Sequence, residues 1–155
     1  MHWADAKVSK HILFDICGLK LAADASAIST IHDYLPIQAV AGTVSWFLGL
    51  AVVNGRLIPV TDLGAFSGQH PSTGRTLQLR ASIATVALKV DDVIGLHSTR
   101  PARAPQVVRE RMPSVAQRLM LSGQTVQSHD VDYEVIDMEA LVESSSFKNV
   151  NGIIA

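Results

Sequence analysis

The side chains in this sequence that could do chemistry lack the partners that chemistry requires. Six histidines stand at positions 2, 11, 32, 70, 97 and 129, and none has a second His or Cys at metal-ligand spacing. Cys17 has no basic neighbour in the sequence that would activate its thiol, which favours a strand residue over a nucleophile. Asp91 and Asp92 are adjacent on an expected strand, so they point to opposite faces. We therefore expect no enzyme, no metal and no cofactor.

The densest charge lies between Arg100 and Arg111, where four arginines stand against Glu110 alone. A groove for nucleic acid usually places aromatic side chains among such charges, and no Phe, Tyr or Trp occurs between Phe66 and Tyr133. A solvated arginine face, or one that meets the carboxylates of a protein partner, is the better interpretation. The alternative is a small β-barrel binding module with an unrelated ligand or a nucleic-acid partner.

Length, composition and net charge limit the class of protein to which these side chains belong. The chain has 155 residues, 48% hydrophobic and 17% charged, with a formal net charge of −1. This is the size of one domain, and the charge argues against a protein that coats nucleic acid or anionic lipid. A single cysteine excludes an internal disulfide framework and suits a reducing compartment. With no long apolar run and no signal-peptide pattern at the N-terminus, we expect a soluble cytosolic domain.

The apolar pattern is mostly of period two, which predicts strands. Ile12, Phe14 and Ile16 alternate with His11, Leu13 and Asp15, and similar alternation occurs near residues 83–90 and 130–135. Asn54-Gly55 is a strong hairpin signal because both residues tolerate positive φ, so we predict a hairpin of residues 50–53 and 56–61. Cys17-Gly18 supplies similar turn chemistry. Short strands at this spacing indicate barrels or a sandwich.

Helical signals are few, and two of them form a weak repeat. Residues 60–66 (VTDLGAF) resemble residues 135–141 (VIDMEAL), each reading as a strand, an Asp cap and a short apolar helix. We expect the first helix to end by Gly68 and the second near Glu143. Residues 106–119 are a possible further helix, bracketed by Pro105 and Pro113. The repeat predicts two similar β-units, each ending one half of the chain, with residues 68–74 between them.

Residues 46–63 (WFLGLAVVNGRLIPVTDL) resemble the signature of the CheW chemotaxis coupling family. Residues 88–96 (LKVDDVIGL) resemble a later motif of that family, and the resemblance extends over about residues 10–143. We expect a single CheW-like domain there, with an N-terminal segment at 1–9 and a C-terminal tail at 144–155. The run SWFLGLA at residues 45–51, with FKNV at 147–150, is most similar to PilI-like proteins of twitching motility.

This resemblance implies an all-β fold with short helices, built as two five-stranded SH3-like β-barrels packed side by side. It also implies a non-catalytic chemosensory adaptor at cytoplasmic, membrane-associated chemoreceptor arrays. Such an adaptor couples the tip of a methyl-accepting chemoreceptor to the CheW-like regulatory domain of a histidine autokinase, within a two-component system. In the PilI-like branch, that system controls type IV pili.

By motif position, the resemblance also implies a receptor groove. Its candidate residues are Ile28, Ile31, Val53, Asn54, Gly55, Val90, Val93 and Leu96. For the strand positions Ile31 and Val90, plain core packing is an equally good interpretation. The family commonly has Arg where this chain has Asn54, and in our alignment a facing Glu falls at Thr30. Both charges of that pair are therefore absent together, which leaves neither one unpaired.

Overall fold

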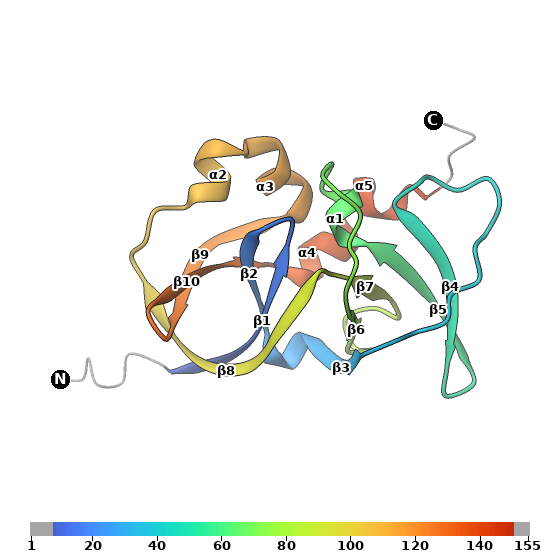
Figure 1. Ribbon diagram of the computed structural model, residues 1–155, viewed down its shortest axis with the longest axis horizontal. Helices are drawn as coiled ribbons and strands as arrows, with labels where there is room; N and C mark the ends of the chain where they lie inside the picture. Colours follow the sequence, from blue (N-terminus) through green and yellow to red (C-terminus); the bar gives the residue numbers. More distant parts are fainter. Residues whose placement is uncertain (1–7, 151–155) are drawn as a thin grey trace.

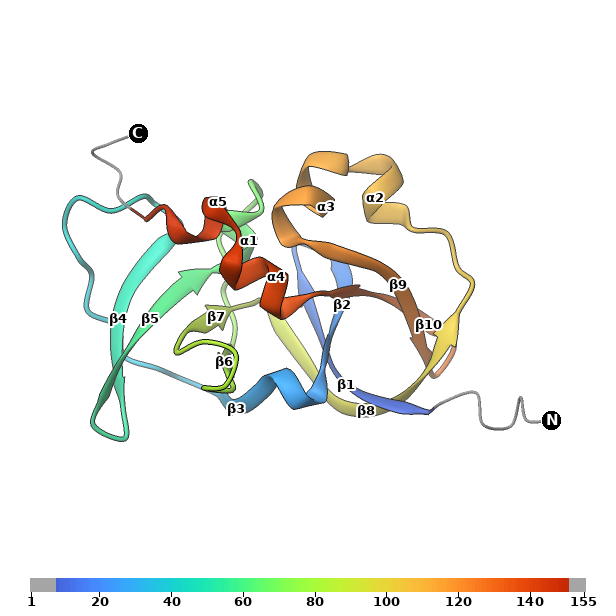
Figure 2. The same ribbon diagram turned by 180° about the vertical axis from the view of Figure 1, so that it is seen from behind.

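The computed structural model describes residues 8–150 and shows two β-units side by side (Figures 1 and 2). The strands are β1 (Ser9–Ile16), β2 (Leu19–Asp24), β3 (Ile28–His32), β4 (Phe47–Val53), β5 (Arg56–Asp62), β6 (Thr76–Leu79), β7 (Ala87–Lys89), β8 (Asp92–Ala102), β9 (Leu121–Ser128) and β10 (Val131–Ile136). The α-helices are α1 (Leu63–Phe66), α2 (Val107–Arg111), α3 (Pro113–Leu119), α4 (Met138–Glu143) and α5 (Ser145–Lys148). A 3-10 helix spans Ala25–Ala27.

The first unit is a closed barrel in the order β1-β2-β10-β9-β8. Most of its neighbours are antiparallel, but β10 runs parallel to β2, and β1 closes the ring against β8. The N-terminal hairpin and the last three strands therefore build one unit together. This leaves the second unit to the middle of the chain.

The second unit is a five-stranded sheet in the order β3-β6-β7-β5-β4, with β5 parallel to β7. Position by position, its strands correspond to β8-β1-β2-β10-β9 of the first unit. The two units therefore share one topology, and the first is a circular permutation of the second. The predicted repeat is confirmed, but the predicted division into halves is wrong. Residues 68–74 connect α1 to β6 inside the second unit, and the chain passes between units at residues 25–27 and 90–91.

Three hairpins turn on pairs of residues with positive φ, as their geometry requires. Cys17 and Gly18 have φ of 50° and 80°, and Asn54 and Gly55 have φ of 51° and 77°. The β9–β10 turn uses His129 and Asp130, at 50° and 62°. The predicted hairpin across Asn54-Gly55 is confirmed, with Val53 opposite Arg56 and Val52 opposite Leu57.

Strand β1 is buried on both faces, although the alternation suggested one core face. Ile12, Phe14 and Ile16 belong to a large cluster that also takes side chains from the second unit, such as Leu77 and Leu88. Leu13 points the other way, into a smaller cluster formed by the first unit alone. A strand between two apolar environments buries both sets of side chains, so period two does not separate inside from outside here.

Helices α1 and α4 begin where the sequence predicts. Asp62 and Asp137 cap α1 and α4, each accepting a hydrogen bond from the backbone N–H three residues on. Residues 106–119 form two helices, because Pro113 begins α3 where α2 has ended. The part of the expected tail that the structure describes forms α5, and Phe147 there is buried.

The C-terminal helices hold the two units together. Helices α4 and α5 follow the last strand of the first unit and lie across α1 of the second (Figure 2). The ring of Phe147 packs against Trp46 and Phe66, with centroid separations of 6.4 and 5.5 Å. Arg118 of α3 donates from Nε to the carbonyl oxygen of Phe66 at 2.9 Å. The orientation of the units is thus set by specific contacts as well as by shared core.

Candidate functional site

The predicted groove residues divide into core and surface. Ile28, Val90 and Val93 are buried at 6%, 0% and 5% exposure, within the core shared by the two units. Ile31 is half-buried on β3, while Leu96 on β8 is 55% exposed. Val53, Asn54 and Gly55 lie at the tip of the β4–β5 hairpin. The structure therefore brings only part of the predicted set to one surface.

A pocket of about 230 Å³ lies against this hairpin. Its lining is Val53, Asn54, Arg56, Ile58, Gln78, Leu79, Ala81 and Thr85. Ile58 and Leu79 are almost wholly buried and form an apolar floor, whereas Asn54, Arg56 and Ala81 are exposed at the rim. We call this the hairpin pocket. Arg56 is the one charged residue of its lining, so the pocket can accept an apolar side chain beside an acidic or neutral polar one.

Strand pairing positions the polar wall of the hairpin pocket. Gln78 on β6 lies opposite Thr30 of β3, and its Oε1 is 2.8 Å from Nε2 of His32. Gln78 therefore links two of the predicted positions: Thr30 is its partner across the strands, and Asn54 lies with it in the pocket lining. Of these groups, sequence reasoning identified Thr30 and Asn54 but missed Gln78, because strand register is a tertiary property.

The outer face of the same hairpin carries a second apolar surface. Val52 and Leu57 are opposite one another across the strands, and they are 65% and 62% exposed. Alternation along each strand sends Val53 and Ile58 to the pocket and their neighbours outward. The hairpin projects at one end of the molecule (Figure 1), so it presents different side chains in two directions.

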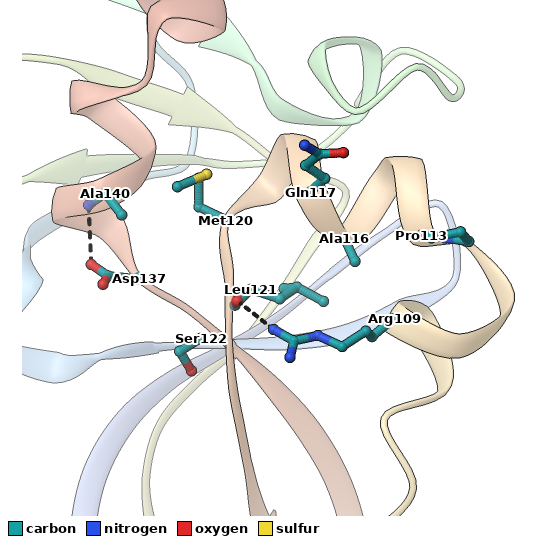
Figure 3. Close-up of a pocket in the computed structure, with 9 residues that line it drawn as sticks. All are labelled: Arg109, Pro113, Ala116, Gln117, Met120, Leu121, Ser122, Asp137 and Ala140. Carbon is teal, nitrogen blue, oxygen red and sulfur yellow. Dashed lines mark hydrogen bonds between the residues drawn. The ribbon is translucent and has the colours of Figure 1, made fainter.

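A second pocket, of about 480 Å³, lies between α3, β9 and α4 (Figure 3). Its lining residues are Arg109, Pro113, Ala116, Gln117, Met120, Leu121, Ser122, Asp137 and Ala140. Arg109 donates from Nη2 to the carbonyl oxygen of Leu121 at 3.0 Å. Sequence reasoning found the arginine cluster that contains Arg109 but not the cavity, because the cavity forms only where residues 109–122 fold back on themselves and meet the start of α4.

The single cysteine and the acidic pair have structural roles. Burial raises the pKa of the Cys17 thiol, whose Sγ lies 3.4 Å from the carbonyl oxygen of His70 as a hydrogen-bond donor. Asp91 accepts hydrogen bonds from the backbone N–H of Cys17 at 2.6 Å and of Thr73 at 3.0 Å. It therefore ties the β1–β2 turn to the α1–β6 loop. These contacts agree with the structural interpretation of both features.

His11 on β1 is a buried histidine. Its Nδ1 lies 2.6 Å from Oγ1 of Thr99, and burial lowers its pKa while nearby Asp24 opposes that shift. Within residues 8–150, no three His, Cys, Asp or Glu side chains gather in a way that could hold a metal ion. None of the helices in this range is long and apolar enough to cross a membrane.

Fold and site together define a two-unit β protein whose surface offers apolar pockets rimmed by arginine and amide groups. Residues 10–146 match the family of the CheW-like domain, and the chain belongs to that family. This is a family of non-catalytic scaffolds in chemotaxis signalling.

A solved structure supports the fold assignment. The scaffolding protein TtCheW from Thermoanaerobacter tengcongensis is similar, with a TM-score of 0.65 and 15% identity over 90% of this chain and 96% of that one. Among curated proteins, no sequence matches the chain significantly. The expected CheW-like fold of two five-stranded units is therefore confirmed.

Proposed function

We propose that this protein is an adaptor that couples the cytoplasmic tip of a methyl-accepting chemoreceptor to the CheW-like regulatory domain of a histidine autokinase. The observation that carries the proposal is the β4–β5 hairpin, which presents the hairpin pocket on one side and the Val52–Leu57 surface on the other. An adaptor needs two surfaces that two partners can occupy at once, and this hairpin supplies both.

The receptor tip is the occupant that we assign to the hairpin pocket. A helical hairpin binds by placing apolar anchors into a groove, and the floor of Ile58 and Leu79 is suited to one such anchor. Asn54 at the rim and Thr30 beside Gln78 stand where the resembling family usually has Arg and Glu, so the contact depends on apolar burial and on Arg56. Ile28, Val90 and Val93 support this region from the core, and Leu96 lies outside the pocket lining.

The kinase regulatory domain is the occupant that we assign to the Val52–Leu57 surface. Two large apolar side chains with most of their area in water are typical of a surface that another protein covers. Its position at the end of the second unit suits a partner that docks on barrel ends (Figure 1). The adaptor acts at cytoplasmic receptor arrays, and similarity to the PilI-like branch supports control of type IV pilus twitching motility.

Isothermal titration with each partner from the same organism tests this proposal. Val53→Asp places a carboxylate in the hairpin pocket and should abolish binding to the receptor fragment while kinase binding persists. Leu57→Asp should have the opposite effect. Val131→Asp on β10, where the side chain is 38% exposed, is the matched control. If the folded wild-type protein binds neither partner, the adaptor proposal is wrong; if both substitutions weaken both partners equally, the surface assignment is wrong. Loss of twitching in cells without the protein tests the motility assignment.

A further inference from the structure

Two arginines outside the hairpin are held in place by backbone carbonyl groups. Arg109 of α2 donates to the Leu121 carbonyl at 3.0 Å, and a Cβ at Gly123 would lie only 3.4 Å from its Nη1. Arg118 of α3 donates from Nε to the Phe66 carbonyl at 2.9 Å, and its Cζ lies 4.2 Å from the centroid of the Phe66 ring. Each guanidinium is thus fixed, and each keeps Nη donors that no described residue uses.

These arginines line two neighbouring pockets. Arg109 lines the pocket of about 480 Å³ shown in Figure 3, and Arg118 lines a neighbouring pocket of about 350 Å³. The two pockets share Gln117 and Met120, so they are adjacent at the end of α3. We call the two adjacent pockets together the α3 groove. It is bounded by α3, β9, α4 and the start of α5, and an elongated open groove is better suited to a chain segment than to a compact metabolite.

The chemistry of the α3 groove selects an anionic occupant with apolar side chains. The floor near Arg109 is made of Ala116, Met120, Leu121 and Ala140. The one acidic residue in either lining, Asp137, already accepts the α4 N-cap hydrogen bond from Ala140 at 3.0 Å. No other acidic side chain lines either pocket, so the two arginines supply the charge of the groove.

We propose that the α3 groove binds an acidic, apolar segment of a partner protein, with one carboxylate on Arg109 and another on Arg118. Fixed guanidinium groups bind carboxylates strongly because little side-chain entropy is lost on binding. A nucleic acid would need flat aromatic surfaces for its bases, and no aromatic residue lines either pocket. This surface is separate from the hairpin pocket and does not depend on the adaptor proposal.

Fluorescence anisotropy with labelled peptides tests the assignment. The probe is a peptide of repeating Glu-Leu-Ser units, and its controls are Gln-Leu-Ser and Glu-Ser-Ser repeats, which remove the charge or the apolar side chain. Binding of the first peptide, in preference to both controls, is the expected result. Methyl labelling of methionine should then show a shift at Met120. Absence of peptide binding at low salt, or tighter binding of a labelled oligo-dT strand that displaces the peptide, overturns the proposal.

Matched variants locate the binding. Arg109→Gln should weaken the Glu-Leu-Ser peptide about tenfold, the loss expected for one charge-assisted contact. Ala140→Glu should weaken it similarly, because a carboxylate then faces Arg109, while its first-turn position in α4 favours Glu and preserves the helix. Ala140→Gln and Arg100→Gln are the controls and should change affinity less than about twofold. Equal losses in Arg109→Gln and Arg100→Gln would indicate general charge attraction and would overturn the site.

Discussion

Asp62 and Asp137 occupy equivalent positions in the two units. Each ends a strand, and each accepts a hydrogen bond at Oδ1 from the N–H three residues on, Ala65 and Ala140, at 3.0 Å in both cases. They differ in surroundings. Asp62 is 3% exposed and also accepts from the Ser72 N–H through both carboxylate oxygens, at 2.9 and 3.0 Å. Asp137 is exposed and, among side-chain hydrogen bonds of the described residues, has only the cap.

This difference predicts unequal costs for the same substitution. Asp137→Ala should lower the free energy of unfolding by about 1 kcal/mol, the usual value of an N-cap. Asp62→Ala should cost at least about 2 kcal/mol, because it also leaves the buried N–H of Ser72 without an acceptor. Urea denaturation of both variants measures the two values. Equal costs would mean that the Asp62–Ser72 contact adds nothing to the cap.

The local structure followed from the sequence, but the connection between the units did not. The repeat around Asp62 and Asp137 identified both caps, and Asn54-Gly55 identified its hairpin, because these signals act over a few residues. The circular permutation was missed. The pairing of β2 with β10 places Ala22 opposite Val135, and these residues are separated by most of the sequence. No local sequence pattern encodes such a contact.

The candidate site was predicted in outline. Motif position led to Val53, Asn54 and Gly55, and the first two line the hairpin pocket. Ile28, Val90 and Val93 have the same apolar character but are buried between the units. An apolar residue on a strand can line a binding groove or pack in the core, and its sequence context is the same in both cases. The sequence alone therefore does not distinguish groove residues from core residues. No sequence pattern predicted the position of the Arg118 side chain, because its hydrogen-bond partner Phe66 is remote in sequence.

Gly49 permits a close approach at the open edge of the second unit. Its φ is +132°, and a Cβ there would clash with the carbonyl oxygen of Gln38, which exchanges two backbone hydrogen bonds with Leu50 at 2.8 and 2.9 Å. Gly49→Ala should therefore lower stability by more than about 2 kcal/mol, through backbone strain and the clash together. Gly55→Ala has the strain without the clash and should cost about 1 kcal/mol. Thermal unfolding compares them, and a milder effect at Gly49 would contradict this account.

Buried His11 predicts a loss of stability on acidification. Burial lowers its pKa below the ordinary 6.5, so the unfolded chain binds a proton more readily than the folded one. The stability contribution of neutral His11 is fully present above pH 6.5 and is lost as the pH falls through the lowered folded pKa. His11→Gln should flatten the dependence of unfolding free energy on pH in that window, relative to the wild-type protein. Denaturant melts across that pH range measure both slopes, and an unchanged slope in His11→Gln would refute the assignment.

Phe147 predicts that the C-terminal helix contributes to the stability of the whole domain. Its ring is 6% exposed and packs against Trp46 and Phe66, while Phe66 also supports Arg118 of the first unit. Phe147→Ala should therefore lower the free energy of unfolding by about 3 kcal/mol, within the range for a buried aromatic ring. The neighbouring Lys148→Ala removes only an exposed ion pair with Glu143 and should cost less than about 1 kcal/mol. Because the cluster joins both units, chemical denaturation of Phe147→Ala should remain a single transition with a lower midpoint. Two separate transitions would show instead that the units unfold independently once this contact is lost.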